Sequence, residues 1–227
     1  MKYIMNTDTY LIRRSRMVER LKSAGIRNET VLRAISRVPR HLFIEDIFEN
    51  HAYDDLSLPL PAGQTISQPY IVARMSELLC SPTIGFPQKV LEIGTGCGYQ
   101  TAVLDSIGIG SIYSIERIKK LHDIARYNLQ NSGFYRARLI YADGYAGLPS
   151  FAPFDGIIIT AAPPQIPVPL LQQLATGGRM VLPLGDEQQQ FLYLIEKTEQ
   201  GYRETCLERV NFVPMLDGKI QVNGRNK

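Results

Sequence analysis

Three glycines at alternate positions follow directly on a short apolar run of the chain. Residues 90–99 read Val-Leu-Glu-Ile-Gly-Thr-Gly-Cys-Gly-Tyr. Glycines in such a turn let the backbone and a bound molecule approach closely. In open α/β sheets, ligands bind outside the carboxyl ends of the strands, which is where this turn would lie. The segment therefore predicts a binding site that is built from Glu92, Gly94, Thr95, Gly96 and Gly98.

A carboxylate at the end of the next predicted strand narrows the kind of ligand. Glu116 lies 22 residues after Gly94, where a carboxylate can accept hydrogen bonds from both hydroxyls of a ribose. Dinucleotide sites use G-x-G-x-x-G and place a pyrophosphate at a helix N-terminus, whereas the spacing here is G-x-G-x-G. Glu92 would repel phosphates but tolerate the sulfonium and amino groups of S-adenosyl-L-methionine. We expect that cofactor, with S-adenosyl-L-homocysteine as its product.

A second acidic position, Asp143-Gly144, follows the third predicted strand. At the carboxyl edge of the sheet, the Asp143 carboxylate could hold the adenine amino group of the cofactor. An Asp-Gly pair also forms turns that need no ligand. We favour the ligand interpretation and leave the turn open.

The elements that must position these residues alternate in type along the chain. Such alternation predicts a parallel sheet covered by helices on both faces. After it, residues 191–197 and 206–213 have no crossover helix between them and predict a closing antiparallel hairpin. The fold class is thus a doubly wound, mostly parallel α/β sheet of seven strands. The other strands are expected at 89–93, 111–115, 138–141, 156–160 and 179–184, and the helices at 99–106, 119–131 and 168–174.

An N-terminal helical cap precedes this core. Helical periodicity runs over residues 17–48, with Asn28 as a helix cap, and residues 1–16 are expected to be a flexible extension. Residues 52–68 contain Pro59, Pro61 and Gly63 and predict a long ordered loop without regular structure. Pro69 suits the first turn of a helix that ends near Leu79. We expect one domain, with a helical and loop part at 17–80 and a cofactor-binding core at 88–216.

Composition limits the other function classes. The formal net charge of the 227 residues is +3, too small for the electrostatic footprint of a dedicated nucleic-acid binder. The longest apolar stretch, residues 156–162, is far short of the roughly 20 residues of a membrane span, and residues 1–16 lack the apolar stretch of a signal peptide. Cys80, Cys97 and Cys206 have no spacing suited to zinc or a redox pair. We expect a cytoplasmic monomer with no metal, and a Cys97 that makes the cofactor site sensitive to thiol reagents.

From about Met17 to Leu216 the chain resembles the protein-L-isoaspartate O-methyltransferases, which methylate isoaspartyl residues in damaged proteins. The glycine turn is shared by many methyltransferases, whereas the segment at 63–69 is close to diagnostic for this family. The resemblance implies a Rossmann-like methyltransferase fold. It rests on residues 39–43, Gly63-Gln64-Thr65-Ile66-Ser67-Gln68-Pro69, the glycine turn, Glu116-Arg117, Asp143-Gly144, residues 154–156 and 160–163, 177–179, 182–185 and 212–214.

The resemblance also implies roles for the loop before Pro69. It places the hydroxyl of Ser67 at the active site as the catalytic position, with Gln64, Thr65 and Ile66 enclosing the donor and the isoaspartyl group, and it adds Arg117 to the cofactor site. Without it, Ser67 would be interpreted as a helix cap. Isoaspartyl-containing proteins and peptides would be the substrates, and the methyl ester would lose methanol to form a succinimide.

The implied chemistry needs no general base. An isoaspartyl α-carboxyl should have the pKa of a terminal carboxyl, roughly 3.3–3.7, and is already ionised at neutral pH. The enzyme would mainly align the reactants and exclude water. We therefore interpret His41, His51 and His122, which lie outside the strand ends, as structural or solvated.

Three alternatives stay open at this point. A nucleic-acid methyltransferase is disfavoured, because the Pro163-Pro164 pair lacks a preceding Asp or Asn and no cysteine follows a proline. A nicotinamide-dependent oxidoreductase is disfavoured by the glycine spacing. A binding protein without catalysis would keep the cofactor turn, but the intact loop at 65–67 argues against it.

Overall fold

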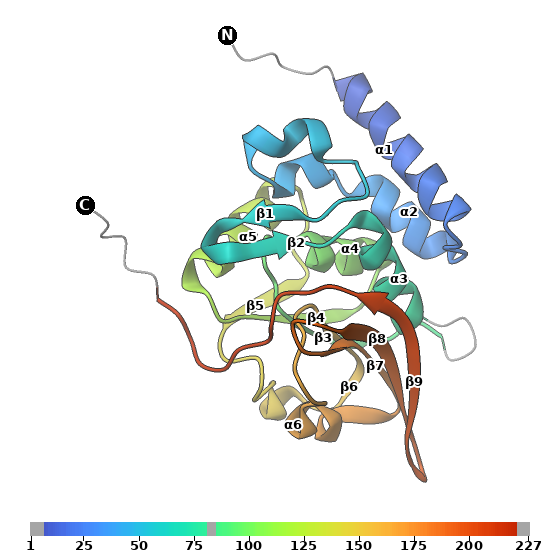
Figure 1. Cartoon of the computed structure of the whole chain (residues 1–227), viewed down its shortest axis with the longest axis vertical. Coiled ribbons are helices and arrows are strands. Elements are labelled where there is room, and N and C mark those ends of the chain that lie inside the picture. Colours follow the sequence, from blue (N-terminus) through green and yellow to red (C-terminus); the bar gives the residue numbers. More distant parts are fainter. Residues whose placement is uncertain (1–6, 81–84, 222–227) are drawn as a thin grey trace.

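The computed structural model describes residues 7–80 and 85–221 (Figure 1). Its main element is a seven-stranded sheet in the order β5-β4-β3-β6-β7-β8-β9. Five strands pair in parallel: β3 (Lys89–Ile93), β4 (Ser111–Glu116), β5 (Ala137–Tyr141), β6 (Phe154–Ile159) and β7 (Leu174–Gly185). The antiparallel strands β8 (Gln190–Thr198) and β9 (Gly201–Val210) complete the sheet. The predicted mostly parallel sheet with a closing hairpin is confirmed.

Successive strand residues point to opposite faces of this sheet, and both faces are apolar, so helices cover both of them. On one face, Val90 and Ile112 pack with α3 (Pro69–Leu79) and α4 (Tyr99–Ile107), and α5 (Lys119–Asn131) lies beside α4. On the other face, Leu91 and Ile157 pack with α6 (Val168–Gln172). Figure 1 shows α4 and α5 on the opposite side of the sheet from α6.

The strand order reverses beside β3. From β3 the chain moves outward through β4 to β5, and then returns to the other side of β3 with β6 and β7. Such a reversal leaves a crevice at the carboxyl end of the central strand, where open α/β sheets bind ligands. The predicted glycine turn lies directly at that end, after Ile93.

The N-terminal helix begins earlier than predicted. Helix α1 spans Thr7–Ser23, so the expected flexible extension at 1–16 is wrong from Thr7 onward, and residues 1–6 lie outside the described residues. Tertiary contacts hold the early turns: the Tyr10 ring stacks on His41 at a centroid distance of 3.9 Å, and Arg14 donates to the carbonyl of Arg37 at 3.1 Å. A periodicity argument cannot detect contacts of this kind.

The rest of the N-terminal helical region is helical as predicted, but it is divided into shorter helices. Asn28 caps helix α2 (Glu29–Arg37): its Oδ1 accepts from the N–H groups of Thr30 and Val31 at 3.0 and 3.3 Å. The short 3-10 helices η1 (Arg40–Phe43) and η2 (Asp46–His51) continue it. The predicted cap at Asn28 is confirmed.

The segment before α3 contains regular structure that the sequence does not suggest. Strands β1 (Leu58–Leu60) and β2 (Gln64–Ile66) form an antiparallel ribbon joined by the 3-10 turn η3 (Pro61–Gly63). The expectation of a loop without regular structure is therefore wrong here. Proline is tolerated in strands at sheet edges, where its missing N–H is not needed, and both strands of a two-stranded ribbon are edges.

After β9 the chain turns back over the carboxyl ends of the parallel strands. The N–H of Ala162 donates to Val213, and the N–H of Met215 donates to Ala162, both at 2.8 Å. The last predicted strand, 206–213, is therefore misplaced, because β9 already ends at Val210. Figure 1 shows the red segment after β9 passing back toward β5. We call residues 211–221 the C-terminal strap.

Candidate functional site

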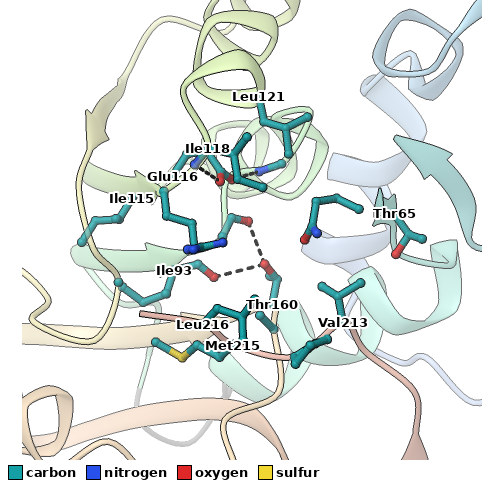
Figure 2. Close-up of a pocket in the computed structure, with 17 residues that line it drawn as sticks. Thr65, Ile93, Ile115, Glu116, Ile118, Leu121, Thr160, Val213, Met215 and Leu216 are labelled. Atoms are coloured by element: carbon teal, nitrogen blue, oxygen red, sulfur yellow. Dashed lines mark hydrogen bonds between the residues drawn. The ribbon is translucent and has the colours of Figure 1, made fainter. Parts of the chain in front are cut away.

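A cavity lies at the carboxyl ends of β3, β4 and β6, beneath the C-terminal strap. The space between its walls amounts to about 720 Å³, part of which is open solvent. Figure 2 shows Glu116 and Ile115 across the cavity from Thr65, with Met215 and Leu216 of the strap along another side. We call it the central cavity. The residues that line it are Gln64, Thr65, Ile93, Gly94, Gly96, Ile115, Glu116, Arg117, Ile118, Leu121, Gly144, Thr160, Ala161, Val213, Pro214, Met215 and Leu216.

The glycine turn forms one wall of the central cavity and depends on glycine at its first position. Gly94 has a φ of +95°, and a Cβ there would lie 2.4 Å from the Oγ1 atom of Thr160. Thr160 Oγ1 itself donates to the carbonyl of Gly94 at 2.7 Å. The turn is thus closed against the end of β6, and only glycine permits this approach.

Glu116 reaches the cavity from the end of β4 and is almost fully buried. Its Oε2 accepts from the N–H of Gly96 at 2.8 Å, and its Oε1 accepts from the N–H of Ile118 at 2.9 Å. Each carboxylate oxygen has two lone pairs, so each retains acceptor capacity. Burial raises the pKa of Glu116, and the backbone N–H groups oppose that shift. Glu116 lines the cavity wall with acceptor capacity to spare, while its contact with a ribose stays a prediction.

Glu92 lies behind the glycine turn rather than in the lining of the cavity. It is fully buried, and its Oε2 accepts a hydrogen bond from Thr101 Oγ1 at 2.5 Å, whereas Oε1 has no hydrogen-bond partner among the described residues. Burial raises the pKa of Glu92 to about 7. The structure therefore separates Glu92 from the residues that can touch a bound molecule directly.

Asp143 makes the contacts of a turn residue. Its Oδ1 accepts from the N–H of Tyr145 at 2.9 Å, and its Oδ2 accepts from the N–H of Gly218 in the strap at 2.8 Å. Asp143 is not part of the lining of the central cavity, whereas the adjacent Gly144 is. These contacts are those expected if Asp143 only shapes a turn, and its contact with the adenine stays a prediction.

The other predicted cofactor residues divide between lining and support. Gly96 and Arg117 line the central cavity, and Thr95 bonds through its hydroxyl to that of Ser114 at 2.6 Å beneath the turn. Gly98 is the left-handed residue before α4, with a φ of +91°. Arg117 donates to the carbonyls of Asp217 and Gly218 at 2.9 and 3.0 Å, so this side chain anchors the strap.

The end of β2 and the residue after it face the glycine turn across a second, smaller cavity. Thr65, Ile66 and Ser67 line this inner cavity, together with Gly94, Thr95, Gly96, Cys97 and Thr160. Ser67 is half-buried, and the cap position of α3 is Gln68 without a side-chain cap bond. The helix-cap alternative for Ser67 is therefore not what the structure has.

Cys97 also lines the inner cavity, but its thiol is deeply buried. Burial raises the pKa of Cys97 to about 11. Because the thiolate is the reactive form, the expectation that Cys97 makes the site sensitive to thiol reagents is not supported by its surroundings.

Besides apolar residues of the sheet and of α5, such as Ile115 and Leu121, two groups of lining residues were missed by sequence reasoning. Thr160 lies between the central and inner cavities, and its position directly after a buried strand could have drawn attention to it. Val213, Met215 and Leu216 come from the strap, whose return over the sheet leaves no local signal in the sequence.

The lining suits a molecule with a polyhydroxylated part and a flat apolar part. Glu116 and the turn backbone supply the polar groups, and Ile115, Leu121 and Met215 supply apolar surface. Among residues 7–80 and 85–221, no three His, Cys, Asp or Glu side chains gather to hold a metal ion. In the same ranges, no helix is long and apolar enough to span a bilayer.

Comparison with known families decides among the remaining alternatives. Residues 12–220 match the model of the protein-L-isoaspartate(D-aspartate) O-methyltransferase family. The chain belongs to this family. A protein-L-isoaspartate O-methyltransferase of Chromobacterium violaceum is 56% identical over 206 residues, covering 91% of each chain. One of Nitrosomonas eutropha is 53% identical, covering 91% of this chain and 92% of its own.

Solved structures agree on the fold of this methyltransferase family member. One protein-L-isoaspartate O-methyltransferase superposes with a TM-score of 0.79 at 27% identity, over 88% of this chain and 65% of that one. A Plasmodium falciparum protein, solved in complex with S-adenosyl-L-homocysteine, superposes with a TM-score of 0.76 at 24% identity, over 89% and 98%. The Rossmann-like methyltransferase fold is confirmed.

Proposed function

We propose that this family member transfers a methyl group from S-adenosyl-L-methionine to the α-carboxyl of L-isoaspartyl residues in damaged proteins. The family's name adds D-aspartyl residues as further acceptors. One observation beyond family membership supports the proposal: the central and inner cavities share Gly94 and Gly96 of the turn and the side chains of Thr65 and Thr160. A donor in one and an acceptor in the other would meet between these two side chains.

The donor would be held in the central cavity. Glu116 would accept the ribose hydroxyls through the lone pairs that its backbone contacts leave free. Glu92, which lies behind the glycine turn, would stabilise the positive charge of the donor without touching it, since a buried carboxylate attracts a nearby cation. Gly94, Thr95, Gly96 and Gly98 would shape the turn, while Arg117, Asp143 and Gly144 would fix the strap edge and the adenine side.

The reaction itself is one displacement. An oxygen of the acceptor carboxylate forms a bond to the methyl carbon, the bond from that carbon to sulfur breaks, and its electron pair neutralises the sulfonium. The products are a methyl ester and S-adenosyl-L-homocysteine. The ester then loses methanol when the following backbone nitrogen attacks it, which gives a succinimide.

The residues of the chain supply alignment and exclusion of water. The acceptor is already a carboxylate at neutral pH, so no side chain has to remove a proton. Ser67, at the inner cavity, would donate its hydroxyl hydrogen to the acceptor carboxylate. Thr65 and Ile66 of the inner cavity and Gln64 of the central cavity would enclose it. Such alignment is worth up to about 7–11 kcal/mol.

The proposal covers partners and location as well. The substrates are isoaspartyl proteins and peptides, and the formal net charge of +3 supports no nucleic-acid partner. Cys80, Cys97 and Cys206 are free thiols, in keeping with a reducing, cytoplasmic compartment. The proposal includes no membrane partner and assigns a monomer.

The deciding experiment uses two peptides that differ only at one residue, isoaspartate in one and aspartate in the other. With labelled S-adenosyl-L-methionine, we expect base-labile label on the isoaspartyl peptide alone. Label on neither peptide, with donor binding confirmed by calorimetry, would contradict the acceptor assignment while leaving the donor site.

A further inference from the structure

A third cavity leads from the same junction to the surface. The space between the walls of this outer cavity amounts to about 920 Å³, part of it open solvent, and its lining shares Thr65, Thr160 and Val213 with the central cavity and Ser67 with the inner one. Its far end is formed where β9 passes into the strap, and the exposed Arg209 lies there. If the proposed function holds, the outer cavity is where the chain flanking an isoaspartyl residue must lie.

Arg209 is the only charged side chain among the described residues that line the outer cavity. Its Nη2 donates to the carbonyl of Gln188 at 3.2 Å, which leaves most of its five donors available. No carboxylate lies within ion-pair distance of Arg209 in the described part of the chain, and the neighbouring Glu208 is paired with Arg74 at 3.0 Å. The guanidinium is thus a cation without a carboxylate partner at the rim of a neutral cavity.

The backbone beside Arg209 is held in place. The side-chain amide of Gln190, itself buried, accepts from the N–H of Phe212 at 2.7 Å and donates to its carbonyl at 3.1 Å. Phe191 of β8 pairs with Arg209 in the sheet register. The backbone position of Arg209 relative to the reaction junction is therefore fixed by the sheet, and its side chain reaches the rim of the outer cavity from there.

We propose that Arg209 is a specificity-determining residue, which favours acceptor peptides that carry an Asp or Glu side chain near the isoaspartyl residue. The inference rests on the proposed function and names a preference within it. Exposed ion pairs contribute little, so the preference for an acidic over an amide flank should be about two- to fivefold. It should weaken as ionic strength rises, because the pair is solvated.

The test measures kcat/KM for isoaspartyl peptides with Glu or Gln two residues before, or two residues after, the isoaspartate. We expect the wild type to prefer Glu on at least one side through a lower KM, R209K to retain part of the preference, R209Q to lose it and R209E to reverse it. Arg203 is the matched control: it lies on the same strand, outside the cavity lining, and pairs with Glu196 at 3.8 Å. R203Q should keep the wild-type preference.

Two results would overturn the inference, and they are distinguishable. Equal preferences in the wild type and R209Q, with both enzymes methylating the peptides, would remove the role of Arg209 and leave the proposed function intact. Failure of the wild type to methylate any isoaspartyl peptide while it binds the donor would remove both. Donor affinity, measured by calorimetry for each variant, verifies that the substituted proteins are folded.

Discussion

Glu116 Oε2 accepts a hydrogen bond from the backbone N–H of Gly96 at 2.8 Å, which ties the end of β4 to the middle of the glycine turn. The second oxygen holds the N–H of Ile118 at the same edge. One carboxylate therefore fixes the local backbone and also presents lone pairs to the central cavity. The shape of the turn and the affinity for the donor should depend on the same side chain.

Replacing Glu116 with alanine should weaken donor binding by about 1.5–3 kcal/mol, the usual value of hydrogen bonds to a charged group. Isothermal titration with S-adenosyl-L-methionine measures this loss. E116Q, which keeps an acceptor oxygen, should lose less than E116A. The exposed Glu187, on the turn between β7 and β8, is the matched control, and E187Q should bind like the wild type. Unchanged affinity in E116A would refute the ribose assignment.

Replacing Ser67 with alanine should lower kcat for an isoaspartyl peptide while donor affinity stays unchanged. The stability of S67A should also be unchanged, because Gln68 occupies the cap position of α3. Asn28, a true cap of α2, provides the contrast: N28A should lose about 1 kcal/mol of stability and retain its kcat. An S67A enzyme with full turnover would leave the hydroxyl without a catalytic role.

Glu92 should make the ligand-free protein less stable as the pH rises. Burial raises its pKa to about 7, from an ordinary value of 4.5, so the folded state holds this proton more tightly than the unfolded state. The corresponding stability is fully present below pH 4.5 and is lost by about pH 7, a change of about 3 kcal/mol. The E92Q variant has no ionisable group at position 92, so its stability should lack this pH dependence.

Denaturant unfolding of the wild type and E92Q between pH 4 and pH 8 measures this effect. The free energy of unfolding of the wild type should fall relative to that of E92Q across the interval. A difference between the two proteins that does not change with pH would show that Glu92 is not held as the acid in the folded protein.

The three thiols should differ sharply in reactivity. Cys206 is exposed on β9, whereas burial raises the pKa of Cys80 to about 12 and that of Cys97 to about 11. In the native protein a thiol reagent should modify one cysteine quickly and the other two only on unfolding. C206S should remove the fast phase. Rapid, donor-protected labelling of Cys97 would restore the expectation of a thiol-sensitive cofactor site.

The positions of the main strands and helices follow from local patterns. The limits of β3 and α5 are those predicted, because a buried apolar strand and an amphipathic helix each carry their periodicity in a short window. The start of α1 was missed, because its early turns depend on the contacts of Tyr10 and Arg14 with the rest of the cap. The β1–β2 ribbon was missed because Pro59 lies in an edge strand and Pro61 and Gly63 lie in the turn that joins the two strands.

The sequence by itself determined the sheet, the glycine turn, the donor class and the acidic residue at the end of β4, since each rests on residues close together in the chain. Only the tertiary structure decided which of these residues touch the cavity. It left Glu92 and Asp143 out of the lining, and it brought Thr160 and the strap into it. The strap lies there because Ala162 pairs with Val213 and Met215, and hydrogen bonds between segments this far apart in the chain leave no periodicity in either segment.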